Sequence, residues 1–227
     1  ANDTYLASIV INLYNTTGLV NSTSTSTANN YVNITGLSDG TYYFNATASD
    51  SAGNVNNTGT RQVSIDSNGP VITVTSPANT IYNNNSIIIN FTSSDSLSTI
   101  DKMWFFNGTG NTTYTTVISQ TVSDGSNTWI FYSNDTAGNI NSSSVTFTVD
   151  TVYPQIQMVY PANITYNSII NVMNYSVSDN IALSSCWYTN NSGLNNYSVA
   201  CGTNITGFNS DQGSNSWIIY GNDSANN

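Results

Sequence analysis

The chain has 227 residues, of which 38% are hydrophobic, but its 12 acidic side chains are matched by only 2 basic ones and no histidine. Two cations cannot neutralise the phosphates of a nucleic acid or of an anionic membrane, which excludes both as partners. Without histidine or glutamate the chain lacks common general bases for neutral pH, so we do not expect an enzyme.

Short strings recur along the chain at steps of about 85 residues. They read Asp-Ser-Ala-Gly-Asn at 50–54, Asp-Thr-Ala-Gly-Asn at 135–139 and Asp-Ser-Ala-Asn-Asn at 223–227. Pro-Ala-Asn at 77–79 returns at 161–163. Recurrence at one step indicates tandem domains, which we place at 1–66, 67–150 and 151–227.

The apolar residues alternate with polar ones inside each repeat, as in Tyr42, Phe44 and Ala46 of the first repeat. In the middle repeat this pattern and the turn residues predict strands near 71–75, 86–93, 100–106, 112–118, 119–122, 127–134 and 143–149. Short strands in units of about 85 residues are typical of a β-sandwich. We therefore predict an all-β chain of tandem immunoglobulin-like antiparallel β-sandwiches.

The first and last repeats are incomplete against this frame. The first lacks its first strands and the last lacks its last strand, which leaves an open sheet edge. Either the chain is part of a longer array, or a neighbouring chain supplies the missing strand. We favour the longer array.

The recurring frame resembles the immunoglobulin-like repeats of large prokaryotic surface proteins. The residues that carry the likeness are Asn-Asp-Ser/Thr-Ala-Gly-Asn, then Val-Asp-Thr, then Pro-Ala-Asn. The segment Cys186–Tyr188, closed by Cys201, is similar to repeats common in archaeal surface proteins. The resemblance implies a fold and a cell-surface or extracellular location, while adhesins, layer proteins and filaments all contain such repeats.

Asn-x-Ser/Thr triplets occur 18 times and predict N-glycosylation of an exported protein. Several of these asparagines, such as Asn33, Asn45, Asn90 and Asn174, fall on the polar phase of apparent strands. The alternative is that asparagine merely fills exposed positions. The predicted acceptors are Asn2, Asn15, Asn21, Asn33, Asn45, Asn56, Asn84, Asn90, Asn107, Asn111, Asn134, Asn141, Asn163, Asn174, Asn190, Asn196, Asn204 and Asn222.

Cys186 and Cys201 are the only cysteines, and both belong to the third repeat. Two cysteines without histidine do not make a zinc site. They form either a disulfide or two buried thiols, and export favours the disulfide.

All 12 acidic residues are aspartates, and seven of them recur at equivalent positions of the linkers and loops. In a head-to-tail array of sandwiches, the linker before a domain approaches two of its loops. This predicts two groups of three carboxylates: Asp66 with Asp95 and Asp135, and Asp150 with Asp179 and Asp223. Calcium would relieve the repulsion within each group. Alternatively each aspartate caps its own turn, as we also expect of Asp39, Asp124 and Asp211.

The strand near 127–134 is apolar on both faces, because Trp129 and Phe131 alternate with Ile130 and Tyr132. Its outer face needs cover from tyrosines, glycans or another chain. We therefore predict a structural segment of an extracellular glycosylated filament, sheath or surface layer that packs with copies of itself. The alternative is a stalk or carbohydrate-binding module of an adhesin, with other cells or surface glycans as partners.

Overall fold

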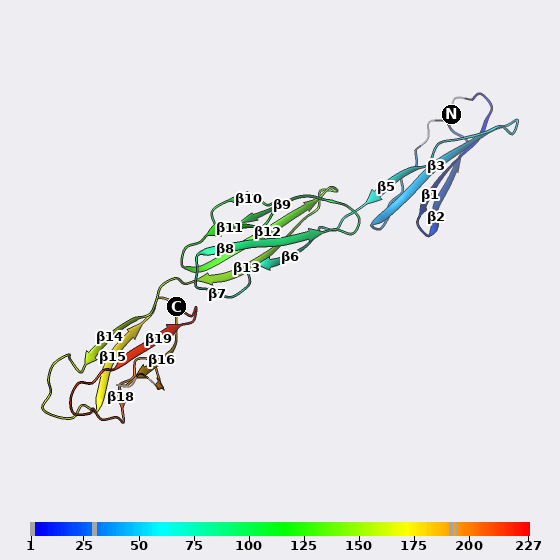
Figure 1. The fold of residues 1–227 in the computed structure, drawn as a ribbon. Coiled ribbons are helices and arrows are strands. Elements are labelled where there is room, and N and C mark those ends of the chain that lie inside the picture. Colours follow the sequence, from blue (N-terminus) through cyan, green and yellow to red (C-terminus); the bar gives the residue numbers. More distant parts are fainter. Residues whose placement is uncertain (1–2, 29–30, 191–192, 194) are drawn as a thin grey trace. The chain divides into compact units, whose positions relative to one another are not determined.

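The computed structural model describes residues 3–28, 31–190, 193 and 195–227, and within them it forms 19 β-strands and no helix (Figure 1). The predicted all-β class is therefore confirmed. No described segment is a helix able to cross a membrane. The chain divides into two compact units, which comprise Ala1–Thr73, Thr92–Trp104 and Tyr132–Ser142, and Val74–Phe91, Phe105–Phe131 and Ser143–Asn227.

One sheet contains the strands before residue 66, namely β1 (Leu6–Asn15), β2 (Gly18–Thr25), β3 (Gly40–Asp50), β4 (Val55–Asn57) and β5 (Arg61–Ile65). Their order is β2-β1-β3-β4, and β5 also pairs with β3, so that Arg61 lies opposite Phe44. The buried side chains of this sheet are Leu13 and Tyr42, each 6% exposed. Phe44 lies opposite Leu13, on the same face as these two side chains, and is 37% exposed.

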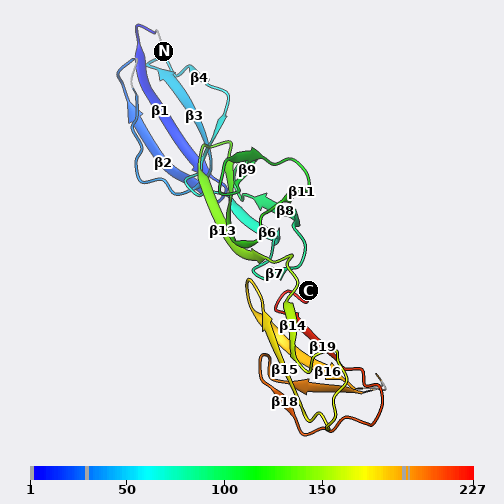
Figure 2. The same cartoon turned by 90° about the vertical axis from the view of Figure 1, so that its left-hand side faces the viewer.

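The middle repeat consists of β6 (Val71–Ser76), β7 (Ile81–Tyr82), β8 (Ser86–Ser94), β9 (Ile100–Phe106), β10 (Asn111–Thr113), β11 (Ile118–Thr121), β12 (Gly125–Asp135) and β13 (Ile140–Val149). They form the sheets β10-β9-β12-β13-β7 and β11-β8-β6. Phe91 of one sheet contacts Phe131 of the other with ring centroids 5.0 Å apart. These two sheets form a sandwich, called the middle sandwich below, and its strands can be followed in Figure 2. Its core is rich in buried aromatic side chains.

The predicted strands of the middle sandwich match the observed ones, with two differences. The segment expected as one strand near 112–118 is instead the short β10, followed by the buried Tyr114, whose hydroxyl accepts the Phe91 N–H at 3.4 Å. The two-residue strand β7 was not predicted, because its pairing with β13 is parallel and too short to show a period.

The third repeat also has two sheets, β14-β15-β18 and β17-β16-β19. Its strands are β14 (Gln155–Tyr160), β15 (Val172–Ser178), β16 (Leu183–Thr189), β17 (Asn196–Val199), β18 (Ile205–Thr206) and β19 (Ile218–Asp223). Met173, Tyr175 and Ile205 form the core, against which Tyr188 and Ile219 of the other sheet pack. The predicted disulfide joins Cys186 to Cys201, with Cα atoms 5.1 Å apart.

Aromatic pairs cover the outer face of the paired strands β9 and β12, and of β16 and β19. Trp104 stacks on Tyr132 at 5.4 Å between centroids, with planes 6° apart. Trp187 stacks on Tyr220 at 5.5 Å and 7°. Tyr132 is half-buried beneath its partner, so the apolar outer phase of β12 is covered in part within its own repeat.

The core of the middle sandwich gives a stability prediction. We expect Phe131→Ala to lower the free energy of unfolding by about 3–5 kcal/mol, because Phe131 is 0% exposed and its loss leaves a cavity. The matched control is Ile88→Ala on β8, where the side chain is 54% exposed and little should change. Denaturant unfolding followed by tryptophan fluorescence measures both, and an equal effect of the two would contradict the assigned core.

Candidate metal centre

The structure brings the predicted aspartates together in two groups. Triad 1 comprises Asp66, Asp95 and Asp135, and triad 2 comprises Asp150, Asp179 and Asp223. In each triad one carboxylate oxygen per residue lies within 4.8 Å of the others. Each triad lies within one compact unit of the chain.

Equivalent elements supply the members of both triads. The first member follows the last strand of the preceding repeat, β5 or β13, and so lies in the linker. The second lies just after β8 or β15, and the third is the last residue of β12 or β19. The aspartates of each triad therefore come together because they occupy equivalent positions of the sequence repeat.

The second member of each triad caps its own turn with one oxygen. Asp95 Oδ1 accepts the backbone N–H groups of Leu97 and Ser98 at 2.9 and 3.0 Å. Asp179 Oδ2 accepts those of Ile181 and Ala182 at 2.8 and 3.0 Å. Turn capping and convergence thus occur in the same residues.

The third member closes the Asp-x-Ala-Gly/Asn-Asn turn. Asp135 Oδ1 accepts the N–H of Asn139 at 2.9 Å, and Asp223 Oδ1 accepts those of Ala225 and Asn227. The turn needs a left-handed residue at its fourth position, where Gly138 has φ +95°. Asn226 takes that position in the third repeat with φ +68°, and asparagine tolerates this region better than most residues.

Two asparagines attach each linker to the turn, a role that sequence reasoning did not assign. Asn139 Nδ2 donates to the backbone carbonyl of Asp66 at 3.1 Å, and Asn227 Nδ2 donates to that of Asp150 at 2.7 Å. The sequence feature that could have indicated this role is that both asparagines end the recurring five-residue string. These bonds bring a linker aspartate to each triad.

Asp39 and Asp124 each accept a hydrogen bond from the linker residue that directly follows Asp66 or Asp150. Asp39 Oδ1 accepts the Ser67 hydroxyl at 2.8 Å, and both oxygens of Asp124 accept the Thr151 hydroxyl at 3.0 Å. The backbone N–H of Asp211 donates to Asn215 Oδ1 at 2.9 Å. Each linker is thus held by a carboxylate on one side and by an asparagine on the other.

Hydrogen bonds lower the pKa of two aspartates in triad 1. The backbone N–H groups of Ser98 and Leu97 lower the pKa of Asp95. Burial raises the pKa of Asp135, but the side-chain and backbone hydrogen bonds of Asn139 outweigh it and the net shift is downward. These groups carry negative charge at neutral pH.

No cationic side chain neutralises either triad. The sequence has only Arg61 and Lys102. In the described part of the chain the one ion pair joins Lys102 Nζ to Asp101 Oδ2 at 3.9 Å on the surface. Carboxylate oxygens at this spacing, with no lysine or arginine side chain paired to them in the described structure, suit a hard divalent ion such as calcium.

Most predicted glycan acceptors are accessible. Nine of the 17 described acceptors are exposed, namely Asn21, Asn33, Asn56, Asn84, Asn111, Asn141, Asn163, Asn196 and Asn204. Half-buried are Asn15, Asn45, Asn90, Asn107, Asn134, Asn174, Asn190 and Asn222, while Asn2 lies outside the described residues. The strand expected around Asn33 was wrong, because residues 31–38 form none.

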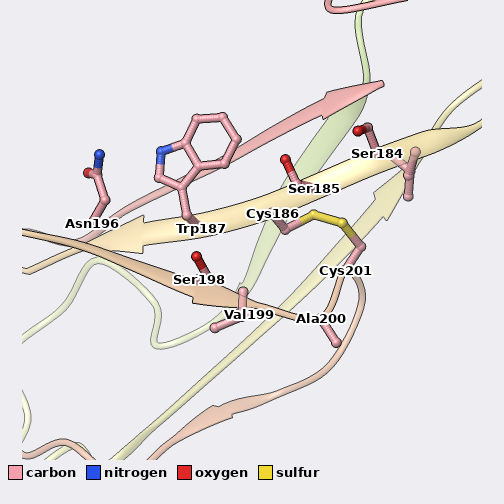
Figure 3. Close-up of a pocket in the computed structure, with 10 residues that line it drawn as sticks. Ser184, Ser185, Cys186, Trp187, Asn196, Ser198, Val199, Ala200 and Cys201 are labelled. Carbon is pink, nitrogen blue, oxygen red and sulfur yellow. A yellow bond between two sulfur atoms is a disulfide. The ribbon is translucent and has the colours of Figure 1, made fainter. Parts of the chain in front are cut away.

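A shallow hollow of about 480 Å³ lies beside the disulfide (Figure 3). It is bordered by the Trp187 ring and by neutral polar side chains such as Ser185, Ser198 and Asn196. Figure 3 shows the Cys186–Cys201 bond joining β16 to the segment after β17. With no ionisable side chain in its lining, this hollow has no acid–base chemistry to offer.

No family model and no curated protein matches the sequence. Solved structures that are similar include fibronectin(III)-like modules of Clostridium thermocellum CbhA, 22% identical over 66% of this chain and 82% of that one, with a TM-score of 0.33. A 1.5-MDa bacterial ice-binding adhesin is 18% identical over 87% and 73%, with a TM-score of 0.32. A tetra-tandem repeat in the extending region of a large adhesion protein is 17% identical over 98% and 60%, with a TM-score of 0.34. The fold assignment rests on the strand pairing and cores of this chain.

The turn at 50–54 in the first repeat gives a prediction of pH dependence that does not involve either aspartate triad. The side-chain and backbone N–H groups of Asn54 lower the pKa of Asp50. A folded-state pKa below the unfolded value means that the stabilisation is complete above about pH 3.9 and is lost as pH falls through the lowered pKa. We expect Asp50→Asn to flatten the acid dependence of the unfolding free energy in calcium-free buffer. Urea unfolding at a series of acidic pH values measures this, and an unchanged dependence would contradict it.

Proposed function

We propose that the chain is a structural, non-enzymatic segment of an extracellular, glycosylated filament, sheath or surface layer, in which calcium holds the linkers between repeats. The repeated sheets, the disulfide and the absence of histidine and glutamate from the sequence support a mechanical role. The resemblance of its repeats to archaeal surface proteins supports a prokaryotic, and specifically archaeal, source.

The observation that carries the calcium function is the burial of acidic groups without a counter-charge. Asp150 and Asp223 are both 0% exposed, and each keeps an oxygen that accepts no hydrogen bond. Burying ionised groups in this way is costly unless a cation compensates them. An ion would link the linker to two loops of the following repeat, because each triad draws one aspartate from the linker.

The glycan coat rests on the acceptor triplets and their accessibility. No described acceptor asparagine is fully buried, and nine of the 17 are exposed. Only 6% of the residues are charged, so attached sugars would supply the hydration that charges give to most soluble proteins.

Packing with copies of the chain rests on the apolar residues left on the surface. Ile88 is 54% exposed and Ile218 is 49% exposed, although both lie on strands. An adhesin stalk or carbohydrate-binding module is the second candidate. The hollow beside Trp187 favours it, because an aromatic ring with neutral polar neighbours suits a sugar.

Electron microscopy of the protein purified from its native source tests the assembly. We expect neighbouring copies in lateral contact over more than about 1,000 Å² in total, with glycans on the exposed acceptors. Isolated chains without lateral contact would favour the stalk. Glycopeptide mass spectrometry provides the independent check, and unmodified asparagines throughout would contradict the glycosylation.

Calorimetric titration of the recombinant chain tests the metal. We expect calcium to bind with dissociation constants on the order of 10⁻⁴–10⁻³ M, the range of extracellular calcium modules. At a calcium concentration 100 times the dissociation constant, binding should stabilise the fold by about 2.7 kcal/mol. Magnesium is the control, and the absence of any calcium signal would contradict the metal function.

A further inference from the structure

The two triads use their carboxylate oxygens differently. In triad 2 every aspartate has a buried oxygen without a hydrogen-bond partner, namely Asp150 Oδ2, Asp179 Oδ1 and Asp223 Oδ2. In triad 1 only Asp66 Oδ2 is in that state. The two triads therefore differ in their unpartnered oxygens, although equivalent positions of the repeat supply both.

Triad 2 divides each carboxylate between two roles. The partnered oxygens accept backbone N–H groups: Asp150 Oδ1 from Val152 at 3.3 Å, Asp179 Oδ2 from Ile181, and Asp223 Oδ1 from Ala225. These bonds fix the orientation of each carboxylate, which leaves the second oxygen for a ligand. The result is three buried acceptor oxygens and no donor to satisfy them.

Triad 1 differs because an asparagine occupies part of the site. Asn139 Nδ2 donates to Asp135 Oδ2 at 3.0 Å as well as to the Asp66 carbonyl. The equivalent Asn227 donates to the Asp150 carbonyl, and Asp223 Oδ2 has no partner. An ion entering triad 1 must therefore share or displace a hydrogen bond that triad 2 does not contain.

We infer that the two sites are unequal: triad 2 binds calcium more tightly and fills first, and triad 1 fills at higher calcium. This inference rests on the proposed calcium function and adds an order of filling to it. In triad 2 the ion breaks no hydrogen bond between described residues and relieves the repulsion of three oxygens held close together. In triad 1 internal hydrogen bonds already relieve part of the repulsion, so binding gains less.

The order of filling makes calcium a graded regulator of the two linkers. At intermediate calcium the linker after β13 is fixed to its repeat through Asp150, while the linker after β5 relies on its hydrogen bonds alone. At high calcium both linkers are fixed. The segment would thus stiffen in two steps as calcium rises.

Two matched double variants of the full chain test the order by calorimetry. Asp150→Asn with Asp223→Asn removes the charges of triad 2, and Asp66→Asn with Asp135→Asn removes the equivalent charges of triad 1. We expect two binding steps in the unmodified chain, about tenfold or more apart in dissociation constant. The triad 2 variant should lose the tighter step and the triad 1 variant should keep it.

Hydrogen exchange of the unmodified chain gives the second measurement, which needs no variant to fold. Amides at 150–153 and 223–227 should become protected at lower calcium than those at 66–69 and 135–139. Protection in the reverse order, or at one shared concentration, would overturn the inference while leaving calcium binding intact. An unmodified chain that binds no calcium would overturn the calcium function itself and this inference with it.

Discussion

The linkers of this chain depend on one electrostatic constraint, which is that carboxylates converge where no cation of the protein can reach them. Only two basic residues exist in the sequence, and Lys102 is already paired with Asp101 at the surface. In a medium of low dielectric, charges of one sign within a few ångströms repel strongly. Hydrogen-bond donors or the proposed ion would relieve this repulsion, and the two triads differ in how many of their buried oxygens accept a hydrogen bond.

The two oxygens of an aspartate allow one residue to serve both the local turn and the long-range contact. Asp179 illustrates this, because Oδ2 caps the turn through Ile181 and Ala182 while Oδ1 has no partner. Turn capping and metal binding are alternatives on the sequence, but in the structure the capping oxygen and the unpartnered oxygen belong to one carboxylate. The cap fixes the orientation of the carboxylate, so little conformational freedom would be lost on binding the proposed ion.

Much of this architecture could be predicted from period-two alternation and repeat spacing, which act locally and are visible in one sequence. The strands of the middle sandwich and the convergence of Asp66 with Asp95 and Asp135 follow from such patterns. The different partners of Asn139 and Asn227 could not be predicted, because they depend on ångström-scale placement of identical side chains. The links from Asp39 and Asp124 to the linkers were also missed, since a turn residue gives no sign of a distant partner.

The scarcity of basic residues has a further consequence for the resistance of the chain to proteolysis. Proteases of the trypsin type cleave after arginine or lysine, and this chain offers them only Arg61 and Lys102. Both lie within paired strands, Arg61 opposite Phe44 and Lys102 in β9, and a protease must first open such a strand to cut it. A chain rich in asparagine, serine and threonine thus offers this class of protease only two cleavage sites, both within paired strands.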